Sequence, residues 1–549
     1  MPVAYTSPVQ LYQQRNLPLN LIALILSYID DLADIARLTR TSRLLYYMTL
    51  PRLYERVILK SYRELRYNDG GRPEGYGGGS PFSMGLNGLV TKNYASYVRS
   101  WTLTGEWRES DVDDFSRGRV PDNSMMLNIA VRAAMDRMER LESFSWELNT
   151  KPFQTIYQGL ISRSTLRSLT LNFPSTRIPR PTVLLPPLPN LREFRALNID
   201  PLCYPDDISL LLLQSKNLEF LTLHWSPRMR DVGEESTNLH AYFGRCMSAN
   251  YSLKLKGLAM YNLFTRNNID FETLVEIEGL EQVTFINCNT QESTTVFVDD
   301  TWRMMIPKVS PKKLRVMRGD TLDSAQARIM PRLKGLECLY LVNNKRKSSR
   351  PASINGFSPA LGVPPASPSP DSPLSRENAA VAADYLAAIT TNLGSTLRHL
   401  LLSDQWHLSK DILTKLARAC PNLEQLGVAL EEKSPECMRG IMIHLPKLWA
   451  LRILVRAPRH EIELMESISN DLHETVIGFE LSRPEWKNLR WLGLGNMVFR
   501  CGGLQEGPSG LDLDGNGGER GDLLRVVRRV EVPMTELPEI WAMDTDALS

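Results

Sequence analysis

The chain has 549 residues, of which 43% are hydrophobic and 23% charged, and its formal net charge is +2. This composition is ordinary for a soluble globular protein, and the near-neutral charge gives no electrostatic reason to expect nucleic acid or a membrane surface as partner. The chain has no run near the ~20 apolar residues that cross a bilayer and no signal-peptide pattern, and its seven scattered cysteines form no CxxC pair, so we expect a cytoplasmic and/or nuclear protein with reduced thiols.

Residues 1–15 are predicted to be an N-terminal tail, and residues 16–60 a small helical domain. In the latter, Leu17, Leu21, Ile25 and Ile29 repeat every four residues, which is the spacing of one helical face, and Ile22 and Leu26 widen that face. Further helices are predicted over residues 32–38 and 42–48. A unit of about 45 residues is near the lower limit for a core of its own, so its excess apolar surface requires a partner, either the rest of the chain or another protein.

The same segment resembles an F-box, residue by residue. The matching positions are Leu17-Pro18, Leu21-Ile22, Ile25, Ile29, Leu32, Ile35, Leu38, Thr41-Ser42-Arg43 and Tyr46. The continuation Leu50-Pro51-Arg52-Leu53-Tyr54-Glu55-Arg56-Val57 is typical of F-box proteins from filamentous fungi, whereas Asn20 and Leu44 replace the acidic residue and the Trp that are usual there. The sequence leaves open a second interpretation, in which these helices only cap the end of a larger domain.

The resemblance implies a three-helix domain that docks onto the Skp adaptor of a cullin–RING ubiquitin ligase. The adaptor-binding residues would be Leu17, Pro18, Leu21, Ile22, Ile25, Leu26, Ile29, Leu32 and Leu38.

Residues 61–95 are predicted to be a flexible connector because glycine is frequent from residue 68 to residue 88. The glycines do not match G-x-G-x-x-G, and no GK[ST] follows them, so nucleotide binding is not expected.

From residue 96 to residue 540 the chain repeats a short strand-like phrase, L-x-x-L-x-L. The phrases begin at Leu141, Leu166, Leu191, Leu218, Leu255, Leu280, Leu336, Leu397, Leu423, Leu448 and Leu489. Several neighbours are about 25 residues apart, which is the period of leucine-rich repeats. Positions 1, 4 and 6 of each phrase would face a continuous core, and the alternate residues would face solvent. We therefore expect an α/β repeat fold, a leucine-rich-repeat solenoid with a curved parallel sheet and outer helices; the alternative is an unrelated α/β domain.

Helices are expected between the strands. Residues 409–419 read as a helix with Ser409 at its N-cap, and residues 376–392 as another that ends before Gly394. The sequence Cys420-Pro421-Asn422-Leu423 resembles the cysteine-containing subclass of leucine-rich repeats that is often found behind F-boxes.

Residues 345–377 are rich in Ser and Pro and are predicted to be a disordered insertion in the solenoid. Ser358, Ser367, Ser369 and Ser372 each precede Pro, so the segment is either a target of proline-directed phosphorylation or an inert linker. Lys345-Arg346-Lys347 is either a nuclear import signal or a solvated basic run. Residues 541–549 are predicted to be a C-terminal tail.

No motif indicates an enzyme, a metal site or a cofactor. Residues 512–517 resemble the start of an EF-hand loop, but Leu523 occupies the twelfth position, where a bidentate Glu is required. Paired Cys/His spacings and nucleophile motifs are absent from the sequence.

We therefore expect a non-catalytic substrate receptor of an SCF-type cullin–RING ubiquitin ligase, which binds the Skp adaptor, and through it a cullin, by its F-box and an unknown target protein by its repeats. The alternative is a repeat scaffold unconnected to ubiquitin. Large residues predicted to face outward from the strands are the candidates for target contact: Phe220, Thr222, His224, Trp225, Tyr340, Trp406 and Trp491.

Overall fold

The computed structural model of the protein describes residues 17–62, 80–107, 122–173, 184–200, 208–226, 239–263, 274–288, 312–320, 322, 327–342, 373–431, 435–454, 470–495, 497–506, 523–532 and 536–544. The chain divides into two compact units, Met1–Thr170 and Leu171–Ser549.

The first unit begins with three helices, α1 (Leu19–Ser27), α2 (Leu32–Leu38) and α3 (Arg43–Leu53). Local hydrogen bonds fix where two of them start: Asp31 caps α2 by accepting from the Ala33 backbone N–H at 2.7 Å, and Ser42 caps α3 by accepting from that of Leu45 at 3.2 Å. The three predicted helices are confirmed, and α3 runs five residues further than expected, through Pro51.

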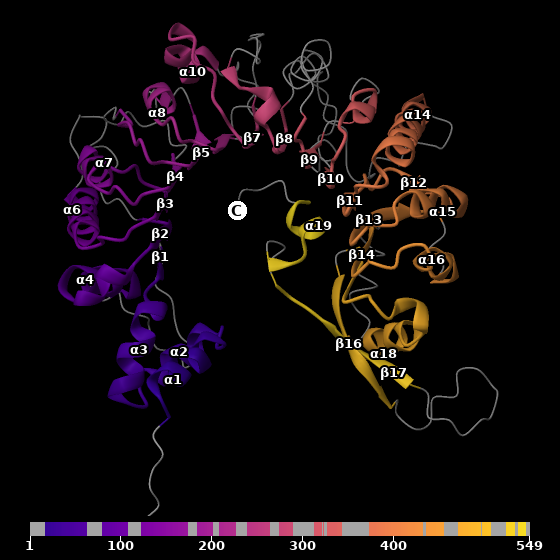
Figure 1. Ribbon diagram of the computed structural model, residues 1–549, viewed down its shortest axis with the longest axis horizontal. Helices are drawn as coiled ribbons and strands as arrows, with labels where there is room; N and C mark the ends of the chain where they lie inside the picture. The colour runs from indigo at the N-terminus through magenta and orange to yellow at the C-terminus, as the bar shows by residue number, and fades with distance from the viewer. Residues whose placement is uncertain are drawn as a thin grey trace, which may run out of the picture. The chain divides into compact units, whose positions relative to one another are not determined.

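Parallel strands follow in the same unit: β1 (Arg56–Ser61), β2 (Ser100–Gly105) and β3 (Ser143–Leu148) pair in that order. The helices α4 (Pro81–Thr91), α6 (Asp122–Asp136) and α7 (Gln154–Ile161) lie along one side of the strands (Figure 1). Between strands and helices, Trp101, Phe144 and Trp146 are fully buried and form the core.

The predicted domain boundaries are corrected in this region. Strand β1 already belongs to the sheet, so the repeat begins at Arg56 and not at residue 96. The predicted connector over residues 61–95 contains α4, which buries Phe82, Leu86 and Leu89. These three residues have the i, i+4, i+7 spacing of a helix face, a signal that the surrounding glycines obscured. Residues 63–79 lie outside the described part of the chain.

The second unit is built on a mostly parallel sheet. Its strands are β5 (Glu193–Ile199), β6 (Phe220–Trp225), β7 (Gly257–Tyr261), β8 (Gln282–Ile286), β9 (Val316–Gly319), β10 (Cys338–Leu341), β11 (His399–Leu401), β12 (His407–Leu408), β13 (Gln425–Leu430), β14 (Ala450–Leu454) and β15 (Trp491–Leu494). Two antiparallel strands, β16 (Met497–Glu506) and β17 (Leu523–Arg529), end it. Strand β4 (Ser168–Asn172) lies at the boundary of the units.

The leucine phrases coincide with these strands, and their core positions are in register. Leu339 of β10 pairs with Leu400 of β11, Leu400 with Leu426 of β13, and Leu426 with Leu451 of β14, and all four side chains are buried. The expected strand-and-helix repeat with a parallel sheet is therefore confirmed, and it is the arrangement of a leucine-rich repeat.

Helices cover one side of this sheet: α8 (Ile208–Gln214), α10 (Leu239–Ser248), α14 (Pro373–Ala388), α15 (Lys410–Ala419), α16 (Pro435–Met442) and α18 (Asn470–Leu481) (Figure 1). The helix predicted over residues 376–392 is confirmed as α14, with a π-helical turn, Ile389–Leu393, at its end. Ser409 is the N-cap residue of α15 as expected, although its side chain makes no capping hydrogen bond. Most of the predicted insertion, residues 345–372 of 345–377, and the EF-hand-like residues 512–517 lie outside the described residues.

A buried polar ladder runs along the carboxyl ends of β5 to β9. The Asn198 backbone N–H donates to His224 Nδ1 at 3.0 Å, and the Asn262 amide lies 2.9 Å from His224 Nε2. Asn287 donates from its amide to Asn262 at 3.1 Å and from its backbone N–H to Asp320 at 3.1 Å. Asn198, Asn262 and Asn287 have φ near +56°, a left-handed conformation that Asn tolerates well. The ladder therefore supplies hydrogen-bond partners to polar groups near the ends of these strands.

Candidate functional site

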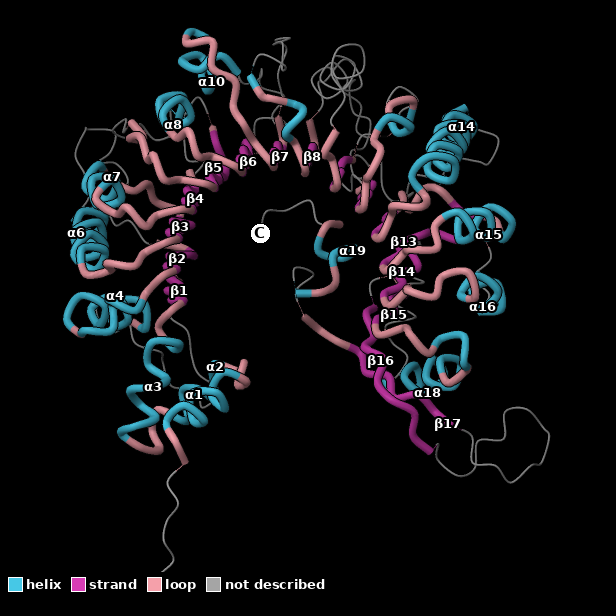
Figure 2. Tube along the Cα trace, viewed as in Figure 1, coloured by secondary structure: helices cyan, strands magenta, loops and turns pink. Residues whose placement is uncertain are grey.

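The C-terminal segment, residues 536–544, lies across the sheet of the second unit. We call the side of this sheet that faces away from α14, α15 and α16 the inner face, and the short helix α19 (Glu539–Ala542) sits on it (Figure 2). The contacts of α19 with β11 and β13 place it near the middle of the strands β9–β15. The C-terminal tail predicted over residues 541–549 is corrected at its start, because Trp541 and Asp544 are buried.

A row of side chains on the inner face runs beneath the segment. Strand pairing aligns Arg318 of β9, Tyr340 of β10, Leu401 of β11, Gly427 of β13, Arg452 of β14 and Gly493 of β15. These residues are the fifth positions of their repeats, which alternate with the core positions and therefore point to the inner face. The row has an arginine near each end, with smaller or apolar side chains between and beside them.

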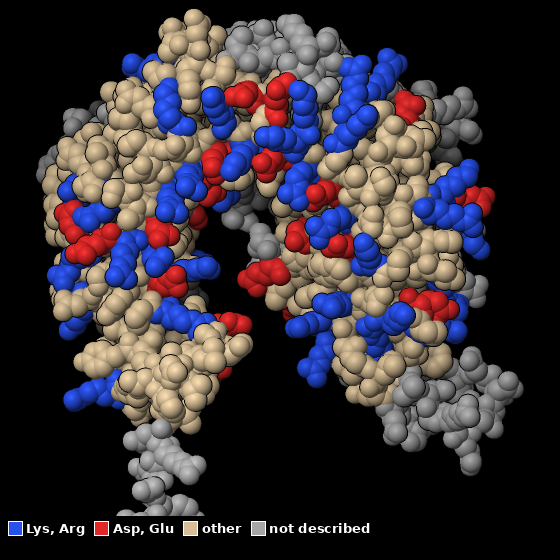
Figure 3. Space-filling view, viewed as in Figure 1, with Lys and Arg blue, Asp and Glu red and all other residues tan. Residues whose placement is uncertain are grey.

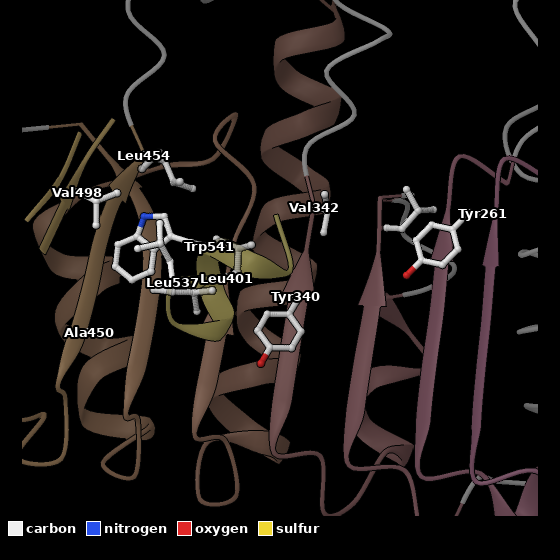
Figure 4. Packing of buried hydrophobic residues seen from close by; sticks show 12 residues of the cluster. Tyr261, Tyr340, Val342, Leu401, Ala450, Leu454, Val498, Leu537 and Trp541 are labelled. Carbon is white, nitrogen blue, oxygen red and sulfur yellow. The ribbon is translucent and has the colours of Figure 1, made fainter. Parts of the chain in front are cut away.

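Apolar contacts hold the segment to this row. Leu537, Ile540 and Trp541 form one buried cluster with inner-face residues that include Tyr340, Leu401, Ala450, Leu454 and Val498 (Figure 4). Gly493 makes room for the indole ring, since a Cβ atom at this position would lie 2.7 Å from Trp541 Cζ2. The indole therefore fits a space that a glycine leaves open.

Polar contacts fix the orientation of the segment. Gln425 accepts a hydrogen bond from the Ile540 backbone N–H at 3.1 Å and donates to the Glu539 carboxylate. Arg452 Nη1 donates to the Ile540 carbonyl at 3.2 Å and pairs with the Asp544 carboxylate at 2.8 Å. Arg318 Nε donates to the Met543 carbonyl at 2.7 Å, and its Nη1 donates to the Tyr261 hydroxyl at 3.0 Å.

The pair of Arg452 and Asp544 is almost fully removed from solvent. Their side chains are 5% and 2% exposed. Removing one partner of such a pair leaves the other charge buried without compensation, which is strongly unfavourable. Arg452 and Asp544 therefore hold each other in place. A carboxylate is required at position 544 of the segment to pair with Arg452.

The pKa values of two further groups in this region, His399 and Glu539, are shifted. Burial lowers the pKa of His399, so its ring is neutral at pH 7, and its Nδ1 lies 2.8 Å from the Tyr340 hydroxyl. Burial tends to raise the pKa of Glu539, but hydrogen bonds from Gln425 and the backbone outweigh it, so this pKa is lowered overall. Glu539 is thus ionised at neutral pH and faces the sheet as an anion.

The residues predicted to contact a target are only partly available. Phe220, Thr222 and Trp491 are half-buried. Trp225 is 0% exposed and Trp406 is 4% exposed, with their rings against Tyr242 and Tyr385, respectively. The prediction that these two Trp residues face outward is corrected. Trp225 follows Leu221 and Leu223 at a spacing of two, so it points to the core side as they do.

The other two candidates are buried for different reasons. His224 belongs to the polar ladder, and Tyr340 lies in the cluster formed by the C-terminal segment. Gln425, Gly493 and Asp544 belong to the site although no sequence motif marks them. The spacing of Leu537, Ile540 and Trp541 (i, i+3, i+4) was the available signal for an amphipathic turn.

The helices α1, α2 and α3 carry a second candidate site, a surface of exposed apolar side chains. In α1 only Leu26 is buried, and Ile25 is 54% exposed. Leu17 and Tyr28, which flank the helix, are 50% and 78% exposed. Leu19, Leu21, Leu24, Leu32, Leu44, Tyr46 and Tyr47 are also exposed. We call these residues the N-terminal apolar surface; on the face that Figure 3 shows, charged side chains are sparse over these helices.

Most of the predicted adaptor-binding residues belong to this surface or its edge. Leu17, Pro18, Leu21, Ile25 and Leu32 are exposed, and Ile22, Ile29 and Leu38 are half-buried. Leu26 is buried, and Arg52 of α3 donates a hydrogen bond to its carbonyl, so Leu26 holds α1 to its neighbours. The prediction that the Leu26 side chain is available to a partner is therefore corrected.

Among the described residues, no helix is long and apolar enough to cross a membrane. The described part of the chain also contains no group of three or more His, Cys, Asp and Glu side chains placed to hold a metal ion.

Comparison with known proteins gives a distant structural likeness. No protein-family model and no curated protein matches the chain. A solved structure titled "Crystal structure of TLR13-ssRNA13 complex" aligns with 65% of this chain at 12% identity and a TM-score of 0.28. The match spans 53% of that chain, about half of its length.

Proposed function

We propose that this protein is a non-catalytic substrate receptor of an SCF-type cullin–RING ubiquitin ligase. In this proposal α1, α2 and α3 form an F-box that binds the Skp adaptor, and through it a cullin, while the repeats bind a target protein. The receptor accelerates ubiquitin transfer by raising the effective concentration of the target near the conjugating enzyme, and no bond is made or broken by its own residues.

The N-terminal apolar surface is the observation that carries the proposal. Many large apolar side chains left exposed on one small helical segment are characteristic of an interaction site. Each aliphatic side chain that a partner covers contributes about 1.5–3 kcal/mol. The exposed set includes Leu17, Pro18, Leu21, Ile25 and Leu32, the positions at which the sequence resembles an F-box.

The alternative, a helical cap on a repeat scaffold, accounts for less of this surface. A cap would bury its apolar face against the repeats. Within the first unit, α3 is the helix that does so: Leu50 is buried, and Tyr54, directly after α3, stacks on Tyr94 with ring centroids 4.1 Å apart. Helix α1 buries one residue, and its remaining apolar side chains are left without a role in a cap.

A pull-down of purified Skp adaptor tests the proposal. The natural chain should retain the adaptor, and a Leu17→Ala, Pro18→Ala, Ile25→Ala variant should lose it by at least tenfold with an unchanged circular dichroism spectrum. The matched control is Met126→Ala, Ile129→Ala, Ile161→Ala, which removes apolar groups of equal exposure from α6 and α7 and should bind normally.

Failure of the natural chain to bind the adaptor would overturn the proposal. A lower melting temperature of the triple variant, with no adaptor binding by either form, would instead identify the helices as a cap and the protein as a repeat scaffold.

A further inference from the structure

The sheet of the second unit is complete without the C-terminal segment. The strands β9, β10, β11, β13, β14 and β15 pair with one another in parallel, and α19 joins no strand ladder. The segment is attached instead by side chains of the inner face that hold its backbone, its Trp and its acidic groups. This is how a folded domain binds a peptide.

The segment does not hold its own conformation. Helix α19 has four residues, far fewer than the roughly 12 that an isolated helix needs to persist in water. Its shape therefore depends on the contacts of Ile540 and Trp541 with the sheet, and a segment released from the sheet would lose its helical order.

The inner face presents charge that suits an acidic peptide. On the segment, Arg452 contacts the Ile540 carbonyl and the Asp544 carboxylate, and Arg318 donates to the Met543 carbonyl. When the segment leaves, the guanidinium groups of Arg318 and Arg452 lose these partners. Between them lies an apolar strip that includes Tyr340 and Leu401, with the indole space at Gly493 beside Arg452. Cations flanking an apolar pocket fit an aromatic anchor followed by an acid.

We propose that the inner face of β9–β15 is a peptide-binding site for target proteins, and that the chain's own C-terminal segment occupies it until a target segment of the same chemistry displaces it. That chemistry is an aliphatic residue, a Trp directly after a second aliphatic residue, and a carboxylate three residues after the Trp, as in Leu537, Ile540, Trp541 and Asp544. The inference deepens the proposed function, because it names the class of target that the repeats recognise.

Self-occupancy sets how tightly a target must bind. A tethered segment acts at an effective concentration that reaches millimolar for short linkers, so it competes strongly with a peptide added in solution. The apparent affinity of the natural chain is reduced in proportion to the fraction of molecules in which the site is open. A variant that cannot close its own site should therefore bind a peptide more tightly than the natural chain does.

The test uses the full chain and a fluorescent synthetic peptide of residues 536–544, Glu-Leu-Pro-Glu-Ile-Trp-Ala-Met-Asp. We expect an Ile540→Ala, Trp541→Ala chain to bind the peptide at least tenfold more tightly than the natural chain in fluorescence anisotropy. Replacing Trp541 or Asp544 by Ala in the peptide should weaken binding to that chain at least tenfold. Adding Gly493→Leu, which fills the indole space, should abolish it, whereas Gly440→Leu, at a glycine with nothing within 4 Å, should not.

A folded Ile540→Ala, Trp541→Ala chain that binds no better than the natural chain would overturn the inference. If that variant does not fold, hydrogen exchange on the natural chain decides. The amides of Trp541, Ala542 and Met543 should exchange at least 100-fold faster than those of β13, because the segment opens by itself. Equal protection would make the segment a permanent part of the fold and overturn the inference. Neither measurement involves the Skp adaptor. A failure of this inference can therefore be distinguished from a failure of the proposed function.

Discussion

Arg452 contacts the C-terminal segment at three points: the Ile540 carbonyl, the Asp544 carboxylate and the Trp541 ring. Besides the contacts to Ile540 and Asp544, its guanidinium carbon lies 5.9 Å from the centroid of the Trp541 ring. A cation near an aromatic face adds attraction that grows when water is excluded. One side chain of the repeat thus connects the backbone, the acid and the anchor of the segment.

Loss of Arg452 should destabilise the docked segment through the charge it leaves behind. We expect Arg452→Ala to lower the free energy of unfolding by about 3–5 kcal/mol, or by the smaller amount that releases the segment, because Asp544 cannot stay buried unpaired. Urea denaturation of Arg452→Ala, Asp544→Ala and the double variant measures this. The double variant should lose clearly less than the two single losses added together.

Additive losses at Arg452 and Asp544 would contradict that account, because independent residues do not share an interaction energy.

Gly493 should be intolerant of even one methyl group. We expect Gly493→Ala to cost about 1–3 kcal/mol, the usual range for overpacking, because the new Cβ would meet Trp541 at 2.7 Å and Arg452 Cγ at 3.0 Å. The control is Gly440→Ala in α16, where nothing lies within 4 Å and removal of a helical glycine should stabilise by up to about 1 kcal/mol. Denaturation midpoints compare the two; equal shifts would mean that the indole does not occupy the space at Gly493.

At the scale of elements, charged residues at the entrance to each strand tie neighbouring repeats together. Arg315 and Glu337 form two hydrogen bonds of 2.9 and 2.8 Å, and Arg398 and Glu424 form two of 2.8 and 3.1 Å. Each of these four residues directly precedes a strand, so opposite charges meet when the strands are in register. These ion pairs favour the observed strand register over a slipped one.

From the ion pairs Arg315–Glu337 and Arg398–Glu424 we expect the stability of the protein to depend on pH. Hydrogen bonds from Arg315 and Arg398 lower the pKa of Glu337 and Glu424, respectively. A carboxyl whose pKa is lowered by folding contributes stability above its unfolded pKa of about 4.3, and that contribution is lost as the pH falls through the folded pKa. The melting temperature of the natural chain should therefore fall more steeply, between about pH 5 and about pH 3, than that of a Glu337→Gln, Glu424→Gln variant. Parallel curves would exclude this contribution.

The elements that could be predicted from sequence are those with a local pattern. The bounds of α2 follow from Asp31 as cap and Ile35 on its buried side, and the strands follow from leucines at a spacing of two and three. Strand β1 has no such phrase; it was missed because Arg56–Ser61 joins the sheet by pairing with β2 across almost forty residues of intervening chain.

The candidate site on the inner face could not be predicted in this way. The fifth position of each repeat points to this face, so the sequence indicates that Arg452 and Tyr340 lie there. What covers them depends on contacts between residues 114 and 225 positions apart, such as Gln425 with Glu539 and Arg318 with Met543. No periodic pattern relates such distant residues, so the docked segment becomes visible only in the folded chain.

At the scale of the molecule, the chain carries two candidate binding surfaces, one in each unit. The N-terminal apolar surface is exposed and rich in leucine and tyrosine, and the inner face of β9–β15 is covered by a segment of the chain itself. In the proposed receptor the first surface is always available to the adaptor, whereas access to the second depends on release of the C-terminal segment. The protein would then join the ligase before it recruits a target.

Titration calorimetry of the natural chain with purified Skp adaptor is the most direct test of the central claim. We expect one adaptor per chain with a dissociation constant of about 1 μM or lower, which corresponds to roughly 8 kcal/mol and is within reach of a few buried leucines. Binding should be lost in the Leu17→Ala, Pro18→Ala, Ile25→Ala variant. If the natural, folded chain gives no binding heat at several temperatures and no complex in size-exclusion chromatography, the assignment as a receptor of the ligase is contradicted.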